Sequence, residues 1–394
     1  MSSGAALRAQ PIEANGLSGL EIVSHVLLGP DDRTPRPAPP AHGARAALEA
    51  AVLAALRRPP CLVTFSGGRD SSAMLAIATR LAAREGLPAP IPITGRYHAP
   101  EAAEDEWQEV LIAELGVDEW WRRQYGDELD LVGPVATDLF RREGLPYPFN
   151  LHLVEPLIAE AAGGSLITGV GGDQALHRAG AFRDVLALRR RPSARDLAWT
   201  AIGLAPRPAR RRMLRGRVEL TFPWLTAEAN AELTRGALEQ ELAEAVTWRR
   251  QVVEVWRSRT MQLNLHRLGG LAARHDVALH HPFADPGFVA ALARDGGRFG
   301  FPSRTAAMAW LFSDALPRQL IARPTKATFD GVLFNRHARA FVAELDEGVL
   351  AEALAALGVA ALADPRALLA EWRGPRPRAN SFLLLQACWM ALRR

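Results

Sequence analysis

The chain has 394 residues, of which 48% are hydrophobic and 23% are charged, and its formal net charge is +4. This composition is typical of a folded globular protein and excludes an extended disordered chain. No apolar run reaches the roughly 18 residues that a membrane span requires, so we expect no membrane partner. The first residues lack the apolar core of a signal peptide, which predicts a cytoplasmic protein.

The number and spacing of the cysteines and arginines limit the metal sites, disulfides and binding partners that are expected. The two cysteines, Cys61 and Cys388, have neither the spacing of a zinc site nor the number that a disulfide framework needs. The basic residues are mostly spread along the chain instead of forming a nucleic-acid-binding stripe, so nucleic acid is not the expected partner. The exception is an arginine-rich stretch over 189–217. It predicts either a solvated surface or a landing site for an acidic substrate or peptide.

The first elements in chain order are an N-terminal arm and a helix. Residues 1–42 are predicted to end in a linker, because prolines are frequent between positions 30 and 40. An alanine-rich helix is predicted over 44–57.

A glycine-rich turn after this helix is the most informative local feature. The apolar run 61–65 predicts a buried strand, and the pattern 73–83 predicts a helix. Between them lie the candidate pyrophosphate-binding residues, namely Ser66, Gly67, Gly68, Asp70, Ser71 and Ser72. Glycines let the backbone approach an anion, the helix N-terminus offers N–H groups, and serine hydroxyls add donors. Asp70 suits a phosphate only through a cation, so we interpret it as a magnesium ligand.

A second glycine-rich turn follows a later strand. A strand over 91–95 gives a βαβ spacing, which predicts an α/β fold with a parallel sheet. A helical stretch over 151–163 leads into another apolar run at 165–168. The turn after that run contains Gly169, Gly171, Gly172 and Asp173. Ligands of open α/β sheets collect at the carboxyl ends of strands, so both turns should face one cleft, where Asp70 and Asp173 could hold a magnesium ion that bridges ATP phosphates.

The remainder of the chain is predicted to be mostly helical from position 226, apart from a Pro/Gly-rich section over 282–302, and to end in a buried helix over 382–392. His280 and His281 lack a partner at zinc spacing and are expected to pack or to form hydrogen bonds. Lys326 is the only lysine in the chain. Its compact charge can follow a developing negative charge, so it is a candidate catalytic residue, with an exposed surface lysine as the alternative.

These motifs resemble, in the same order, those of the synthetase domain of the asparagine synthetase family. The S-G-G-x-D-S loop is matched at 66–71, the strand that ends near the adenine at 93–95, and the S/T-G-x-G-x-D-E turn at 168–174. The family's P-F-L-D element is matched loosely at 281–285, and its essential lysine is matched by Lys326.

The resemblance implies a parallel-sheet PP-loop domain, similar to the adenine nucleotide alpha hydrolases, with helical C-terminal additions. It places that domain at 43–335, with a basic variable insertion at 178–225 and a helical segment at 336–394. It implies ATP as substrate together with Mg²⁺, and it adds Thr94 and Gly95 to the nucleotide-binding residues. In the implied reaction a carboxylate attacks the α-phosphorus of ATP, pyrophosphate leaves, and an amine then takes the acyl group as AMP departs.

Departures from the family pattern concern the acceptor nitrogen. Glutamine-dependent members carry a cysteine after the initiator methionine, whereas Ser2 stands here and residues 1–42 are too short for a glutaminase domain. We therefore expect no glutamine hydrolysis by this chain. Val170 occupies a position that is acidic in asparagine synthetases and tyrosine in β-lactam synthetases, and Ala278 replaces a glutamate. Gln174 replaces the glutamate of the turn.

These changes favour another amine. Lasso-peptide macrolactam cyclases are relatives that adenylate a side-chain carboxylate of a precursor peptide, whose own N-terminus then attacks. The segment around Lys326 is similar to theirs, so we expect a small-molecule or peptide carboxylate, with a precursor peptide or a partner biosynthetic protein. The alternatives are an asparagine synthetase that uses aspartate and ammonia, either free or from a partner glutaminase, and a degenerate subunit that binds ATP or peptide without turnover. A tRNA-modifying enzyme is disfavoured, because the chain lacks a cysteine pair and a recognisable RNA-binding domain.

Overall fold

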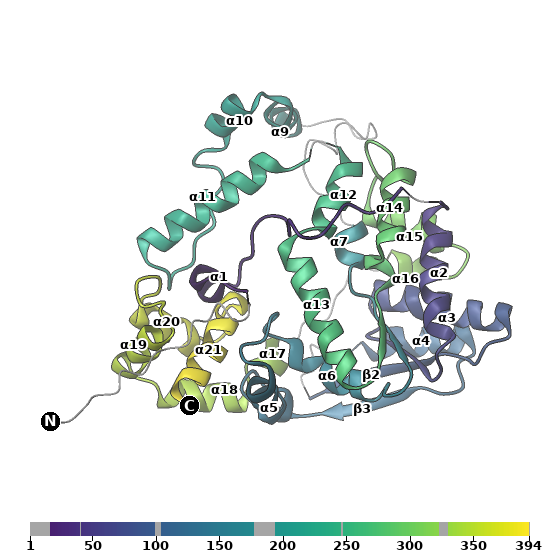
Figure 1. Cartoon of the computed structure of the whole chain (residues 1–394), viewed down its shortest axis with the longest axis horizontal. Coiled ribbons are helices and arrows are strands. Elements are labelled where there is room, and N and C mark those ends of the chain that lie inside the picture. Colours follow the sequence, from purple (N-terminus) through teal and green to yellow (C-terminus); the bar gives the residue numbers. More distant parts are fainter. Residues whose placement is uncertain are drawn as a thin grey trace.

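A computed structural model describes residues 16–39, 41–98, 104–176, 194–245, 247–322 and 330–393 (Figure 1). Within these residues, five parallel strands form one sheet in the order β3-β2-β1-β4-β5. The strands are β1 (Cys61–Thr64), β2 (Ile91–Tyr97), β3 (Trp121–Tyr125), β4 (Ser165–Ile167) and β5 (Ala278–His280). The predicted α/β fold with a parallel sheet is confirmed. None of the described helices has both the length and the apolar character of a membrane span.

The strand order places the two glycine-rich turns next to each other. β1 pairs in parallel with β4, with Leu62 opposite Leu166. Parallel neighbours point the same way, so the turns that follow them leave the sheet at the same edge. The first turn leads into α3 (Arg69–Glu85) and the second into α7 (Gly172–Leu176). This arrangement agrees with the expectation that both turns meet at one site.

Helices cover both faces of the sheet. On one face, a core that includes Met74 and Ile77 of α3 joins the sheet to the surrounding helices. These are α2 (Ala44–Leu56), α4 (Asp105–Leu115), α12 (Trp248–Trp256), α14 (Pro286–Asp295), α15 (Arg304–Phe312) and α16 (Arg318–Ile321). On the other face, α6 (Glu155–Ala159) and α13 (Arg259–Arg274) pack over Leu62 and Leu166. The sheet is therefore enclosed, as expected for parallel strands.

A second core lies beside the sheet, where the C-terminal helices gather in yellow in Figure 1. It is built from α1 (Gly19–Ser24), α5 (Pro134–Glu143), α17 (Asp330–Leu333), α18 (Arg336–Glu344), α19 (Glu347–Ala356), α20 (Pro365–Arg373) and α21 (Phe382–Leu392). The predicted helix over 382–392 is confirmed, and its first seven residues are buried. Ile22 and Val23 of α1 are fully buried in the same core.

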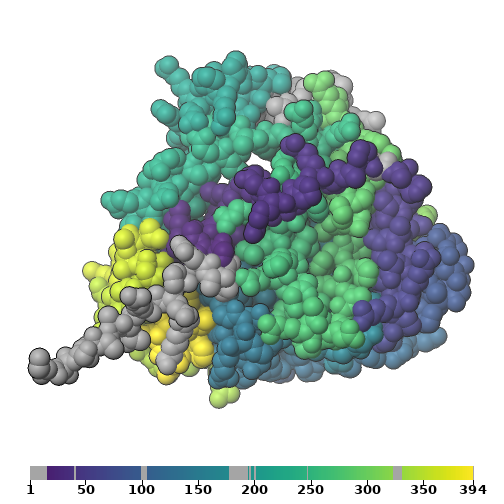
Figure 2. Space-filling model, in the orientation of Figure 1, coloured from purple at the N-terminus to yellow at the C-terminus, as the bar shows by residue number. Residues whose placement is uncertain are grey.

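The proline-rich segment after α1 crosses the molecule as the purple band in Figure 2 and packs against α12 and the start of α13. The N–H of Asp31 donates to the Arg257 carbonyl at 2.7 Å, and Arg257 Nε donates to the Thr34 carbonyl at 2.8 Å. Arg36 forms an ion pair with Glu254 at 2.8 Å. The assignment of residues 1–42 to a separate arm stays a prediction, but the described part of that segment is held on the body by long-range hydrogen bonds.

A small three-helix module occupies the top of Figure 1. It contains α9 (Ala194–Leu204), α10 (Arg207–Leu214) and the distal part of α11 (Ala227–Ala243). Its own apolar cluster is formed by Ile202, Leu214 and Leu242 and is separate from the main cores. The module lies within the predicted basic insertion, except for α11.

Some elements differ from the predictions. β3 and β5 were not predicted, because both are short strands at the sheet edges and β3 carries arginines. The section over 282–302 was expected to be irregular but contains α14. Its proline does not prevent a helix, because Pro286 occupies the first helical turn and Asp285 caps that turn. The helix expected over 151–163 is shorter, because a 3₁₀ turn precedes α6. The short 3₁₀ helices are η3 (Asp127–Leu129), η4 (Leu151–Leu153), η5 (Pro282–Ala284) and η6 (Ala379–Ser381).

Candidate functional site

The first glycine-rich turn is closed by its own serine hydroxyls. Ser71 Oγ accepts a hydrogen bond from the Ser66 N–H at 3.2 Å and donates to the Gly68 carbonyl at 3.0 Å. Gly67 adopts a positive φ of 80°, and a β-carbon there would lie 2.9 Å from Gln108 Cγ. Gly68 has no side chain to cap α3, so the start of this helix can offer its N–H groups to an anion.

Two other candidate residues lie beneath this turn. Thr94 is buried, and its Oγ1 donates to the Phe65 carbonyl at 2.6 Å and accepts from Trp120 Nε1 at 2.9 Å. Ser72 is also buried, and its Oγ donates to the Gly67 carbonyl at 3.4 Å. In this structure both hydroxyls therefore support the turn from within. Gly95 is packed closely, since a β-carbon on it would lie 2.6 Å from the Tyr97 hydroxyl.

The second turn presses directly against the first. A β-carbon on Gly169 would lie 3.0 Å from the Ser71 nitrogen, and one on Gly172 would lie 2.6 Å from Asp70 Oδ1. Gly171 has a φ of 96°, and a β-carbon there would lie 3.1 Å from the Ala284 nitrogen. These close approaches explain why glycine occupies all three positions.

An arginine that the sequence analysis did not identify joins the two predicted metal ligands. Arg304, the first residue of α15, contacts both carboxylate oxygens of Asp70 at 2.7 Å through Nη2. Its Nη1 lies 2.5 Å from Asp173 Oδ1. The structure therefore brings Asp70 and Asp173 together, and the cation between them is the Arg304 guanidinium. The assignment of both residues as magnesium ligands stays a prediction. The only sequence signal for Arg304 was the need for a positive charge opposite two carboxylates.

The two carboxylates differ in their environment. The Asp70 side chain is 17% exposed, whereas that of Asp173 is 44% exposed. Burial raises the pKa of Asp70, although the Arg304 guanidinium opposes this rise. Asp173 therefore lies on the solvent side of the pair and Asp70 on the inner side. Among the described residues, no three or more acidic, histidine or cysteine side chains are grouped so that they could hold a metal ion.

The second turn is supported from β5. Thr168 Oγ1 and His281 Nδ1 are hydrogen-bonded at 2.6 Å, and the same Oγ1 accepts from the Val170 N–H at 3.2 Å. Burial lowers the pKa of His281 to about 4, so its imidazole is neutral near pH 7. The expectation that this histidine forms hydrogen bonds is confirmed. The adjoining segment is held by Trp256 Nε1, which donates to the Ala284 carbonyl at 2.7 Å.

Lys326 lies outside the described residues, so its predicted role stays a prediction. The described helices on either side of its segment are α16, which packs on α3, and α17, which packs on η3. α3 carries Asp70 at its start, and η3 follows β3 directly. Val170, at the altered acceptor position, packs against an apolar cluster that includes Leu279.

Comparison with known protein families agrees with this architecture. The family model described as "Asparagine synthase" matches residues 43–391, which include the sheet, both glycine-rich turns and the C-terminal helices. No curated protein matches the chain. Because the family model covers most of the sequence, we conclude that this chain belongs to the asparagine synthase family.

Proposed function

We propose that this chain is an ATP-dependent, AMP-forming ligase that adenylates a substrate carboxylate and passes it to an amine, with a peptide as the preferred substrate. Membership of the family supports ATP-dependent carbon–nitrogen ligase chemistry in general. One observation carries the assignment to this site. Two glycine-rich turns at the same sheet edge bring Asp70 and Asp173 to a single cation, Arg304.

The residues present fit a magnesium–nucleotide complex. Glycines at 67, 169 and 172 have no β-carbon, and a β-carbon at any of these positions would collide with neighbouring atoms of the two turns. The carboxylates of Asp70 and Asp173 already share the positive charge of Arg304. Asp70 and Asp173 would hold Mg²⁺, which when bound supplies positive charge to the phosphates. The N–H groups at the start of α3 would hold pyrophosphate as it leaves, mainly by positioning and fixed electrostatics.

Arg304 must change partners for this binding to occur. Its guanidinium contacts the same carboxylate oxygens that a metal would use. If Asp70 and Asp173 held Mg²⁺, the Arg304 guanidinium would be released from them and could form planar bidentate contacts to phosphate oxygens. In this proposal Arg304 pairs with both carboxylates when they hold no metal ion, and it would contact phosphate oxygens when they hold Mg²⁺.

The acceptor position supports a carbon–nitrogen ligase that does not use ammonium. Val170 packs with apolar side chains, and Ala278 stands where the family has a glutamate. Neither side chain can accept a proton or orient an ammonium ion. The amine is therefore expected to arrive with its own binding surface, as the N-terminus of a peptide does. In this proposal Lys326 stabilises the negative charge that develops at phosphorus and later at the acyl carbon.

The test is a turnover assay with Mg-ATP that separates AMP and pyrophosphate from ADP and phosphate. The acceptors are acidic peptides with free N-termini and, separately, aspartate with ammonium chloride. AMP formation only with peptides supports the proposal, whereas AMP formation with aspartate and ammonium shows asparagine synthesis. ATP binding without AMP formation from any acceptor shows a degenerate subunit.

Lys326→Arg is the matched variant for this assay. It keeps the positive charge but replaces a compact ammonium by a planar guanidinium, so we expect a folded protein that has lost most AMP formation. Circular dichroism and the thermal midpoint monitor folding. Near wild-type turnover would remove Lys326 from the mechanism.

A further inference from the structure

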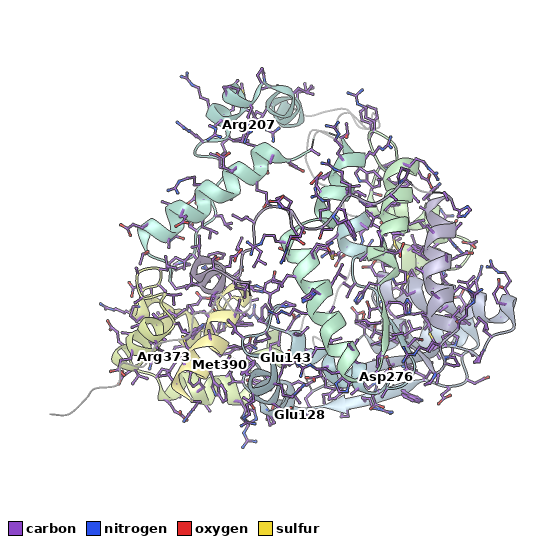
Figure 3. All side chains as sticks on the ribbon, in the orientation of Figure 1. Glu128, Glu143, Arg207, Asp276, Arg373 and Met390 are labelled. Atoms are coloured by element: carbon purple, nitrogen blue, oxygen red, sulfur yellow. The ribbon has the colours of Figure 1, made fainter. Side chains whose placement is uncertain are left out.

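A hollow lined by arginines lies on α10. It has a volume of about 730 Å³ and is lined by Arg207, Pro208, Arg211, Arg212 and Arg215. Arg207 lies on the three-helix module at the top of the molecule in Figure 3. Four guanidinium groups around one hollow repel one another unless nearby acidic groups neutralise their charge.

The described part of the chain compensates this charge only in part. Glu239 of α11 pairs with Arg207 at 3.3 Å and with Arg211 at 2.6 Å. Arg212 and Arg215 are exposed, and no ion pair to a carboxylate among the described residues is formed by either. Two guanidinium groups at the rim of the hollow therefore have donors to offer to an external anion.

The same module also exposes large apolar side chains. Leu197 is 52% exposed, Leu204 is 59% exposed and Met213 is 44% exposed. Leu197 and Leu204 belong to α9, and Met213 belongs to α10. None of them is part of the module's own core, which contains Ile202 and Leu214. Exposed leucine and methionine beside arginines are typical of a surface that another polypeptide covers.

We propose that this arginine-lined hollow binds an acidic segment of the polypeptide substrate, one in which glutamates or aspartates alternate with apolar residues. Carboxylates suit the guanidinium groups by bidentate, charge-assisted hydrogen bonds, and the apolar residues cover Leu204 and Met213. Among the side chains that the structure describes in this module, the exposed apolar ones are aliphatic, whereas single-stranded nucleic acid uses aromatic side chains for stacking. An inorganic phosphate would fill only part of a hollow of about 730 Å³, whereas a peptide segment can contact several of its arginines at once.

This inference rests on the proposed peptide ligase function and gives it a recognition surface. Residues 177–193 connect α7 to α9 in the chain, and α7 carries Asp173 of the proposed nucleotide site. A peptide held at the module is tethered to the enzyme that must adenylate it, which raises its effective concentration at the site.

The test is fluorescence anisotropy with a short fluorescein-labelled peptide rich in glutamate and leucine, measured with the full chain and without ATP. Arg212→Glu with Arg215→Glu is the test variant. Arg366→Glu with Arg376→Glu is the control, because both are exposed arginines near α20 and the change of net charge is the same. We expect the test variant to bind the peptide at least about tenfold more weakly, the control to change less than about twofold, and added salt to weaken wild-type binding.

Three outcomes would overturn the proposal. The first is equal loss of binding in both variants, since this would show a non-specific charge effect. The second is tighter binding of an RNA oligonucleotide than of the peptide with the same dependence on Arg212 and Arg215, since this would assign the surface to nucleic acid. The third is displacement of the peptide by inorganic phosphate at equal concentration, since this would show a simple anion patch.

AMP formation at a saturating concentration of the acidic peptide is measured separately in the same variants. Arg212 and Arg215 lie outside the nucleotide site, so this activity should equal that of the wild type. The two proposals fail in different ways. If the docking proposal fails, the test variant does not lose peptide binding selectively while AMP formation persists, whereas if the ligase proposal fails, neither the wild type nor any variant forms AMP.

Discussion

Arg304 carries the electrostatic balance of the candidate site. It pairs with Asp70 and Asp173, whose carboxylates come from turns that follow neighbouring strands. Two carboxylates at such close quarters repel each other, and burial has already raised the pKa of Asp70. A cation between them, whether the guanidinium or a metal ion, therefore stabilises the pair of ionised carboxylates.

This balance predicts a magnesium-dependent stability in Arg304→Ala. Without the guanidinium the two carboxylates lose their counter-ion, and we expect a loss of about 1–3 kcal/mol in the free energy of unfolding in the presence of EDTA. Adding Mg²⁺ should restore most of that loss, and it should stabilise the variant more than it stabilises the wild type. The thermal midpoint, measured with EDTA and with MgCl₂, checks this expectation.

The double variant Arg304→Ala with Asp173→Asn is the control, because it removes one of the two carboxylates. We expect it to show little stabilisation by Mg²⁺. An equal magnesium effect in the single and double variants would mean that the ion binds elsewhere.

Gly172→Ala tests the contact between the two turns. Its β-carbon would lie 2.6 Å from Asp70 Oδ1, so Asp70 has to move away from Arg304. We expect AMP formation to fall at least about tenfold, as when a reacting group is misplaced by about 1 Å. Gly269→Ala on the exposed face of α13 is the matched control, since nothing lies within 4 Å of its β-carbon. That change should stabilise the protein by up to about 1 kcal/mol through helix propensity and leave turnover unchanged. Unaltered turnover in Gly172→Ala would show that Asp70 tolerates displacement.

At the level of elements, Asp130 joins the loop after β3 to the start of α18. Its buried carboxylate accepts hydrogen bonds from the N–H groups of Val132 at 3.1 Å, Asn335 at 2.9 Å and Ala338 at 2.9 Å. Asn335, the N-cap residue of α18, forms no capping bond with its own side chain. Asp130 therefore caps this helix from a distant part of the chain, and α17 and α18 follow the segment that contains Lys326.

Asp130→Asn should accordingly weaken both stability and turnover. The amide turns a donor toward N–H groups that need an acceptor, which costs about 1–3 kcal/mol of unfolding free energy. We expect kcat for AMP formation to fall while the KM for ATP changes little, because Asp130 anchors the start of α18, which follows Lys326 in the chain, and does not touch the nucleotide loop. Denaturant unfolding and steady-state kinetics measure these effects.

Asp346→Asn provides the comparison with an ordinary helix cap. Asp346 Oδ1 accepts from the Val349 N–H at 2.8 Å at the exposed start of α19. Asparagine is as good an N-cap as aspartate, so stability should change by less than about 1 kcal/mol and kcat should stay constant. A kcat loss as large in Asp346→Asn would show that Asp130 has no special positioning role.

Over the whole molecule, three histidines make stability depend on pH, of which His152 is buried and His25 and His281 are half-buried. Burial lowers the pKa values of His25, His152 and His281 from 6.5 to about 4. The unfolded chain therefore binds protons more readily than the folded protein between these two values, and stability must rise with pH across that range. The stability that the neutral histidines contribute is fully present above about pH 6.5. It is lost as the pH falls toward 4, by up to about 1.4 kcal/mol of unfolding free energy per pH unit for each histidine.

His152→Gln should flatten this dependence. Glutamine can still donate to the Leu129 carbonyl, which His152 Nε2 contacts at 3.0 Å, but it does not titrate. Unfolding free energies at pH 7, 6 and 5 are expected to fall less steeply in the variant than in the wild type. Parallel curves would show that His152 keeps its ordinary pKa in the folded state.

Local patterns were sufficient for the parts of the site that are close in sequence. A short apolar run, glycines and a helix start at 61–72 and at 165–174 predicted two turns at one edge of a parallel sheet, and the pairing of β1 with β4 agrees. This works because strand, turn and helix N-terminus are each encoded by neighbouring residues. By contrast, the edge strands β3 and β5 were missed, since three to five residues leave too little periodicity to recognise.

By itself, the sequence determined the α/β class, the two glycine-rich turns and the meeting of Asp70 with Asp173. Only the tertiary structure decided which cation lies between these carboxylates, which residue caps α18 and how the proline-rich segment is held. Arg304, Asp130 and Arg257 each bind partners far away along the chain. Such contacts depend on how the elements pack, and no local pattern of residues encodes that packing.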